Sequence, residues 1–105
     1  MDLGLKGKSA FVAGSSSGLG RAIAKELIME GCRVAICSRG KDRIEAAASW
    51  LISQTGCEPD RVLPLVCDVT DESEIKKAME DTVSKFGSLN LLVTNSGGPP
   101  TGQIE

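Results

Sequence analysis

Val12-Ala13-Gly14-Ser15-Ser16-Ser17-Gly18-Leu19-Gly20-Arg21 is the stretch that decides the fold of this 105-residue chain. A mainly apolar run precedes the first glycine, and an amphipathic segment follows the last. The three glycines allow, in turn, a sharp bend out of a strand, close approach of backbone to a pyrophosphate, and tight packing of a helix on the strand. A helix that begins here directs free N–H groups and its positive dipole end at an anion. The stretch therefore predicts a strand, a phosphate-binding turn and a helix.

Strand-like and helix-like segments alternate along the rest of the chain. Short apolar runs are typical of buried parallel strands, whereas apolar residues at a period of about 3.6 are typical of amphipathic helices. The pattern predicts strands over Ser9–Ala13, Cys32–Cys37, Arg61–Cys67 and Leu89–Thr94, and helices over Leu19–Glu30, Lys41–Gln54 and Thr70–Phe86. Pro64 cannot donate a backbone hydrogen bond, so the third strand belongs at a sheet edge. These elements predict an α/β fold with a doubly wound parallel sheet in the strand order 3-2-1-4.

The composition is that of an ordinary globular domain, with 41% hydrophobic residues, 25% charged residues and a net charge of −2. Acidic and basic residues are interleaved, which argues against nucleic acid as a partner. No stretch approaches the roughly 18 apolar residues of a membrane-spanning helix, so we expect no membrane association and a cytoplasmic location. The chain has four cysteines without metal-ligand spacing and no histidine. Buried free thiols are therefore expected, rather than a metal site or disulfides.

Candidate cofactor-binding residues follow the strands. Ligands of open α/β sheets bind outside the carboxyl ends of the strands, where the strand order reverses. In the predicted order this place lies between the first and fourth strands. The loops that end there contain the candidate residues Gly14, Ser16, Ser17, Gly18, Leu19, Gly20, Ser38, Arg39, Asp68, Val69, Asn95, Ser96 and Gly97.

The glycine spacing G-x-x-x-G-x-G, Asp68 after the third strand and Asn95-Ser96-Gly97 after the fourth resemble the short-chain dehydrogenase/reductase family. The resemblance spans the chain and matches it to the N-terminal, cofactor-binding part of a longer single-domain enzyme with a Rossmann-type fold. It implies that residues 1–105 form one dinucleotide-binding domain, truncated after the fourth strand. It also implies that Asp68 and the backbone of Val69 contact adenine, and that Asn95-Ser96-Gly97 supports a ribose.

Arg39 follows the second strand, at the position where a carboxylate would bind the adenosine ribose hydroxyls of NAD. A guanidinium instead fits the 2′-phosphate of NADP through charge-assisted hydrogen bonds. Asp42 lies further on, where it suits the first turn of the next helix. The sequence therefore favours NADP as cofactor, with NAD as the alternative. Ser17 departs from the second basic residue that many NADP-preferring members carry before the middle glycine.

Hydride transfer in this family uses a tyrosine as acid–base, a lysine in the following helical turn and a serine, and none of these can be carried over. The chain contains no tyrosine, so we predict no catalytic residue and no hydride transfer by residues 1–105 alone. The resemblance implies that the complete protein is an NADP(H)-dependent oxidoreductase for a carbonyl or alcohol, such as a 3-oxoacyl compound or another ketone. It also implies a homotetramer.

Two other functions stay open from the sequence. Gly14-Ser15-Ser16-Ser17-Gly18 also fits the nucleophile elbow G-x-S-x-G of α/β-hydrolases, with Ser16 as nucleophile, although the chain has no histidine to activate it. Alternatively, the chain is a non-catalytic module that binds a dinucleotide without turning it over. An unpaired apolar edge at Leu89–Val93 argues against this second function, because such edges promote aggregation.

Overall fold

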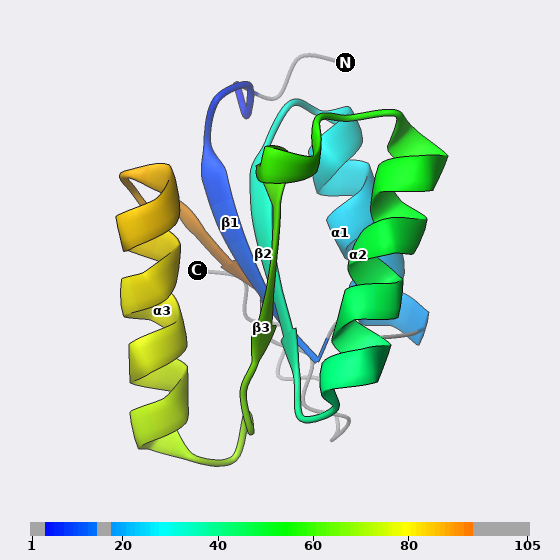
Figure 1. The fold of residues 1–105 in the computed structure, drawn as a ribbon. Helices are drawn as coiled ribbons and strands as arrows, with labels where there is room; N and C mark the ends of the chain where they lie inside the picture. The colour runs from blue at the N-terminus through cyan, green and yellow to red at the C-terminus, as the bar shows by residue number, and fades with distance from the viewer. Residues whose placement is uncertain (1–3, 15–17, 94–105) are drawn as a thin grey trace.

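The computed structural model describes residues 4–14 and 18–93, which form a four-stranded parallel sheet with helices on both faces (Figure 1). The described elements are β1 (Ser9–Ala13), α1 (Gly18–Met29), β2 (Arg33–Ser38), α2 (Lys41–Thr55), the short 3-10 helix η1 (Pro59–Arg61), β3 (Val62–Val66), α3 (Glu72–Phe86) and β4 (Leu91–Val93). The strand order is β3-β2-β1-β4, which confirms the predicted doubly wound α/β fold. Within these described ranges no helix is long and apolar enough to cross a membrane.

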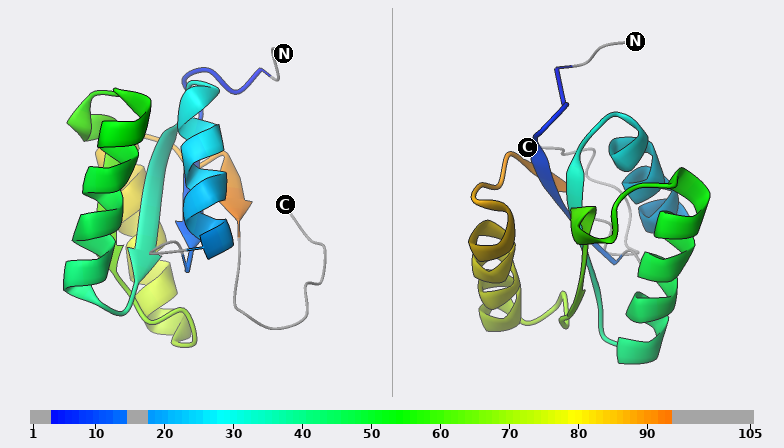
Figure 2. Two further views of the ribbon diagram at one scale, coloured as in Figure 1. Left: turned by 90° about the vertical axis from the view of Figure 1, so that its right-hand side faces the viewer. Right: turned by 45° about the horizontal axis from the view of Figure 1, so that its top comes forward.

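The helices lie in two layers. α1 and α2 cover one face of the sheet, and α3 covers the other (Figure 1, Figure 2). Crossovers between parallel strands are right-handed, so the direction of a crossover decides which face its helix covers. α1 and α2 connect strands in the direction from β1 to β3, whereas α3 connects β3 back to β4, so α3 lies on the other face. The strand order therefore reverses between β1 and β4. The carboxyl ends of the strands share one edge of the sheet.

β1 lies at the centre of the sheet, between β2 and β4. All of its residues are buried, and alternate side chains enter two separate cores. Ala10 and Val12 belong to the core shared with α1 and α2, whereas Phe11 and Ala13 belong to the core shared with α3. This burial on both faces explains why β1 reads as an uninterrupted apolar run.

β3 forms one edge of the sheet, and Pro64 lies within it opposite Ile36 of β2. The edge position predicted from Pro64 is therefore confirmed. The 3-10 helix before β3 was not expected, since Arg61 was predicted within the strand and instead ends this turn. The Nη2 atom of Arg61 donates to the carbonyl oxygens of Ile28 and Cys32, each at 2.9 Å. One side chain thus joins the end of α1 to the start of β3.

β4 is shorter than predicted, because Asn90 pairs with β1 through its side chain. The backbone N–H of Asn90 donates to the carbonyl oxygen of Ser9 at 2.9 Å. The Oδ1 atom of Asn90 in turn accepts the N–H of Ser9 at 2.9 Å. A side-chain amide therefore replaces one step of the backbone ladder, and the strand begins only at Leu91. Thr94, the predicted last residue of this strand, lies outside the described residues.

Capping residues in the sequence mark both ends of α3. Asp71 is the N-cap, and its Oδ1 accepts the backbone N–H groups of Ser73 at 2.9 Å and Glu74 at 3.3 Å. Gly87 is the C-cap with φ of 86°, a conformation that favours glycine. The helix therefore begins two residues after its predicted start at Thr70, and it ends at Phe86 as predicted.

Replacing Asp71 with alanine leaves two backbone N–H groups of α3 without their cap. We expect the free energy of unfolding of the complete protein to fall by about 1 kcal/mol. Urea unfolding followed by circular dichroism measures this. Asp81→Ala is the matched control, since it removes the same charge from an exposed ion pair with Lys77. Equal losses in both variants would mean that charge, and not capping, explains the effect.

Candidate functional site

The carboxyl ends of β1, β2 and β3 surround a cavity of about 200 Å³. Its lining comes from all three loops and from the first turn of α2, and consists of Gly14, Ser38, Arg39, Gly40, Arg43, Cys67 and Val69. The structure thus brings together four of the predicted residues from separate loops. Their contact with a cofactor stays a prediction. The predicted residues Ser16, Ser17, Asn95, Ser96 and Gly97 lie outside the described residues.

The structure describes the glycines on either side of the predicted turn. Gly14 and Gly18 have φ values of 67° and 64°, in the left-handed region where other residues are strained. A Cβ at Gly18 would meet no atom within 4 Å, so the space beside it is open. Gly20 is buried in α1, in agreement with its predicted packing role, whereas Leu19 is 65% exposed. The first turn of α1 holds no acidic residue that would offset its positive dipole end.

Two arginines supply the positive charge of the cavity. Arg39 was predicted, and Arg43 was not. Arg43 lies four positions later, in the first turn of α2, and its side-chain carbons lie 3.6 Å from the point where Gly40 would carry a Cβ. The stem of Arg43 therefore packs back over Gly40 and reaches the cavity wall. The place of Arg43 in the first turn of the helix that follows Arg39 is the signal in the sequence that could have found it.

Asp42 behaves as predicted, as an exposed acidic residue in the first turn of α2. It is not among the residues that line the cavity. The arginines therefore face a wall that contributes no carboxylate of its own.

Asp68 serves first as a turn residue. Its Oδ1 accepts the backbone N–H of Thr70 at 2.9 Å and the Thr70 hydroxyl at 2.7 Å. These hydrogen bonds, and the positive field of Arg39, hold the pKa of Asp68 below its usual value, so the carboxyl is ionised at neutral pH. Glu74 Oε1 accepts the backbone N–H of Asp68 at 2.9 Å and fixes the loop. The predicted contact of Asp68 with adenine stays a prediction.

Thiols form part of the apolar wall. Cys67 lines the cavity and is buried together with Cys37, in the core beneath α3. Burial raises the pKa of both thiols, and burial together with the neighbouring Cys37 raises the pKa of Cys67 to about 12. All four cysteines are free, and Cys57 is the one that is not fully buried. The prediction of free, mostly buried thiols is confirmed.

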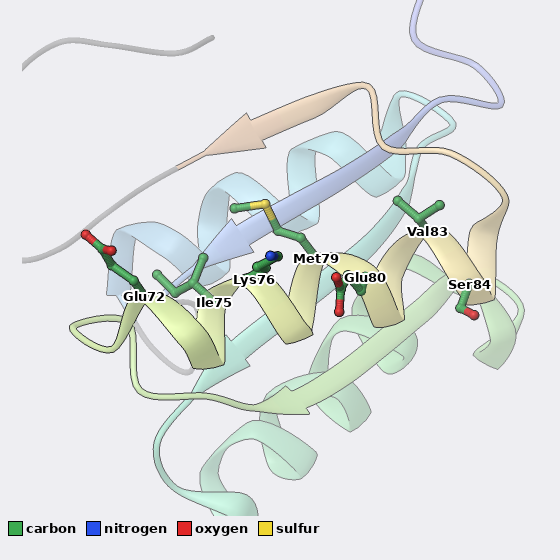
Figure 3. A pocket seen from close by; sticks show the side chains of 7 residues that line it. All are labelled: Glu72, Ile75, Lys76, Met79, Glu80, Val83 and Ser84. Atoms are coloured by element: carbon green, nitrogen blue, oxygen red, sulfur yellow. The ribbon is translucent and has the colours of Figure 1, made fainter.

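The outer flank of α3 carries a larger but shallow hollow of about 670 Å³ (Figure 3). Its lining belongs entirely to α3 and consists of Glu72, Ile75, Lys76, Met79, Glu80, Val83 and Ser84. This surface is mainly apolar, lies on the face of the sheet opposite α1 and α2, and has neither a glycine turn nor an arginine. The smaller cavity at the carboxyl ends of the strands is therefore the candidate site.

A family model of the short chain dehydrogenases matches residues 8–105. The match covers nearly the whole chain, including the glycine turn and all described strands. This chain belongs to the short-chain dehydrogenase family. Membership leaves the hydrolase alternative with Ser16 as nucleophile without support.

Individual relatives agree with this family. The chain is 37% identical over 94 residues to peroxisomal 2,4-dienoyl-CoA reductase of Danio rerio, covering 90% of this chain and 30% of that protein. It is 41% identical over 95 residues to a tropinone reductase homolog of Arabidopsis thaliana, covering 89% of this chain and 34% of that protein. It also resembles L-sorbose reductase from Gluconobacter frateurii, crystallised with NADPH and L-sorbose, with a TM-score of 0.84, 37% identity and coverage of 95% and 37%. The chain thus spans about a third of the length of these relatives.

The raised pKa of Cys67 predicts a loss of stability at alkaline pH. Below the ordinary thiol value of 9.0 the thiol is protonated in both states, and between there and about 12 only the unfolded chain loses the proton. The free energy of unfolding should therefore fall across that range. Urea unfolding at several pH values measures the slope.

Cys67→Ala is the control for this pH dependence, since burial also raises the pKa of Cys32 and Cys37. The variant should show a shallower decline than the wild type, whatever its stability at pH 7. Identical slopes would contradict the assignment.

Proposed function

We propose that the complete protein is an oxidoreductase that transfers hydride between NADP(H) and a carbonyl or alcohol, such as a 3-oxoacyl compound or another ketone. Residues 1–105 supply its cofactor site. The observation that carries this proposal is the cavity where three strands end, whose lining joins the positive-φ Gly14 to Arg39 and Val69. Ligands of doubly wound sheets bind outside the carboxyl ends of the strands, and this cavity extends from the end of β1 toward β2 and β3. Membership of the short-chain dehydrogenase family supports a nicotinamide dinucleotide as the ligand.

The described residues would act by binding and orientation. The start of α1 offers backbone N–H groups and a positive dipole end for a pyrophosphate, and the bare Gly18 leaves room for it. Val69 packs against the core beneath α3 and gives the cavity an apolar side that suits adenine. A bound nicotinamide ring supplies or accepts the hydride. The chain contains neither tyrosine nor histidine. The acid–base group of the reaction therefore lies in the rest of the complete protein.

Arg39 supports NADP(H) over NAD(H). A 2′-phosphate carries close to two negative charges and matches the planar donors of a guanidinium. Among the described residues, no carboxylate lines the cavity to accept the ribose hydroxyls of NAD. The described charges therefore favour the phosphorylated cofactor.

The complete protein forms a homotetramer and is located in the cytoplasm. The family resemblance supports the assembly. Four free thiols support a reducing compartment, because disulfides persist mainly in oxidising ones.

Gly18→Val tests the glycine turn. A branched side chain would enter the open space proposed for the pyrophosphate, so we expect NADPH and NADH both to bind about tenfold or more weakly to the complete protein. Isothermal titration calorimetry measures both affinities, and circular dichroism checks the fold.

Gly56→Val is the matched control for Gly18→Val. Gly56 has φ of 69° and also meets nothing within 4 Å, but it caps the far end of α2. Both variants carry the same backbone strain, about 1–2 kcal/mol. Normal binding by Gly18→Val, or equal loss in both variants, would contradict the proposed turn.

Arg39→Asp tests the cofactor preference. Charge-assisted hydrogen bonds contribute roughly 1.5–3 kcal/mol, so NADPH affinity should fall about tenfold to a hundredfold. NADH affinity should hold or improve, because aspartate can accept the ribose hydroxyls. Titration of both cofactors into wild type and variant measures the ratio. Tighter binding of NADH than of NADPH by the wild type would contradict the preference.

A further inference from the structure

Arg43 brings a second guanidinium to the cavity, on the helix that follows Arg39. Both side chains line the same cavity of about 200 Å³. Within the described part of the chain neither guanidinium has a hydrogen-bond or ion-pair partner, and the described ion pair joins Lys77 and Asp81 instead. Two arginines at one cavity are therefore not engaged by other described residues.

The charges around the two arginines are unequal. Asp68 interacts electrostatically with Arg39 and offsets part of its charge. Asp68 is engaged through Oδ1 by Thr70, and it does not line the cavity. The wall itself contributes two positive charges and no negative one. A ligand group with two negative charges balances this wall, whereas a neutral hydroxyl does not.

We propose that Arg43 is a specificity-determining residue that holds, together with Arg39, the phosphate monoester on the adenosine ribose of NADP(H). This inference rests on the proposed function and adds a second residue to its cofactor specificity. Each guanidinium presents planar donors that match phosphate oxygens, so two of them bind one phosphate from two directions. The side-chain carbons of Arg43 lie 3.6 Å from the point where Gly40 would carry a Cβ, which places the stem beside the cavity wall.

Arg43→Gln in the complete protein tests the inference with two matched ligands, 2′,5′-ADP and 5′-AMP, which differ in the 2′-phosphate. We expect the affinity for 2′,5′-ADP to fall about tenfold and the affinity for 5′-AMP to change less than about twofold. Isothermal titration calorimetry at fixed ionic strength measures both. Arg43→Lys, which keeps the charge but loses the planar donors, should give an intermediate loss for 2′,5′-ADP alone.

Lys41→Gln is the matched control, because Lys41 lies in the same first turn of α2, is exposed and does not line the cavity. It should leave both affinities within about twofold of wild type. Equal losses for both ligands in Arg43→Gln would overturn the inference and assign Arg43 to adenine. Unchanged affinities, or the same loss in Lys41→Gln, would also overturn it.

The same titrations separate this inference from the proposed function. A wild-type protein that binds neither ligand, nor NADPH nor NADH, would contradict the proposed function itself. A wild type that binds 2′,5′-ADP more tightly than 5′-AMP, with the preference lost in Arg39→Gln but kept in Arg43→Gln, would support the function and overturn the role of Arg43.

Discussion

Burial of β1 on both faces and along both edges is the constraint on which the rest of the structure depends. Its backbone pairs with β2 and β4, and its side chains enter a core on each side of the sheet. A strand so enclosed favours apolar residues, which run from Ala10 to Ala13 after the buried Ser9, and the chain can first bend freely at Gly14. Because β1 pairs in parallel with β2, and β2 with β3, this bend lies at the same edge of the sheet as the ends of β2 and β3. The candidate site is thus a consequence of how the sheet is built.

The cavity divides its chemistry between an apolar side and a charged side. Val69 and the protonated thiol of Cys67 face it from the end of β3, while Arg39 and Arg43 face it from the end of β2 and from α2. Such a division suits a ligand with a flat ring and a phosphate, because each part meets an environment that it prefers. The larger hollow on α3 has no arginine, and its charged residues include Glu72 and Glu80, which do not suit a phosphate. The arrangement of charge therefore identifies the site better than size does.

The sequence allowed prediction wherever one local rule decides the outcome. Apolar periodicity located the strands and helices, and the missing donor of Pro64 placed β3 at an edge. Three contacts escaped prediction because they join residues far apart in the chain or across a helical turn. Arg61 reaches back to the end of α1, and Asn90 replaces a ladder step with its side chain. Arg43 lines the cavity with its stem beside Gly40.

A crystal structure of the complete protein with NADPH would show directly whether the cavity at the ends of β1, β2 and β3 holds the cofactor. The account predicts the adenosine 2′-phosphate within about 3 Å of the guanidinium nitrogens of Arg39 and Arg43. It also predicts the pyrophosphate at the start of α1 and the adenine ring beside Val69. A dinucleotide bound on the flank of α3, or one whose 2′-phosphate points into solvent away from both arginines, would contradict the account.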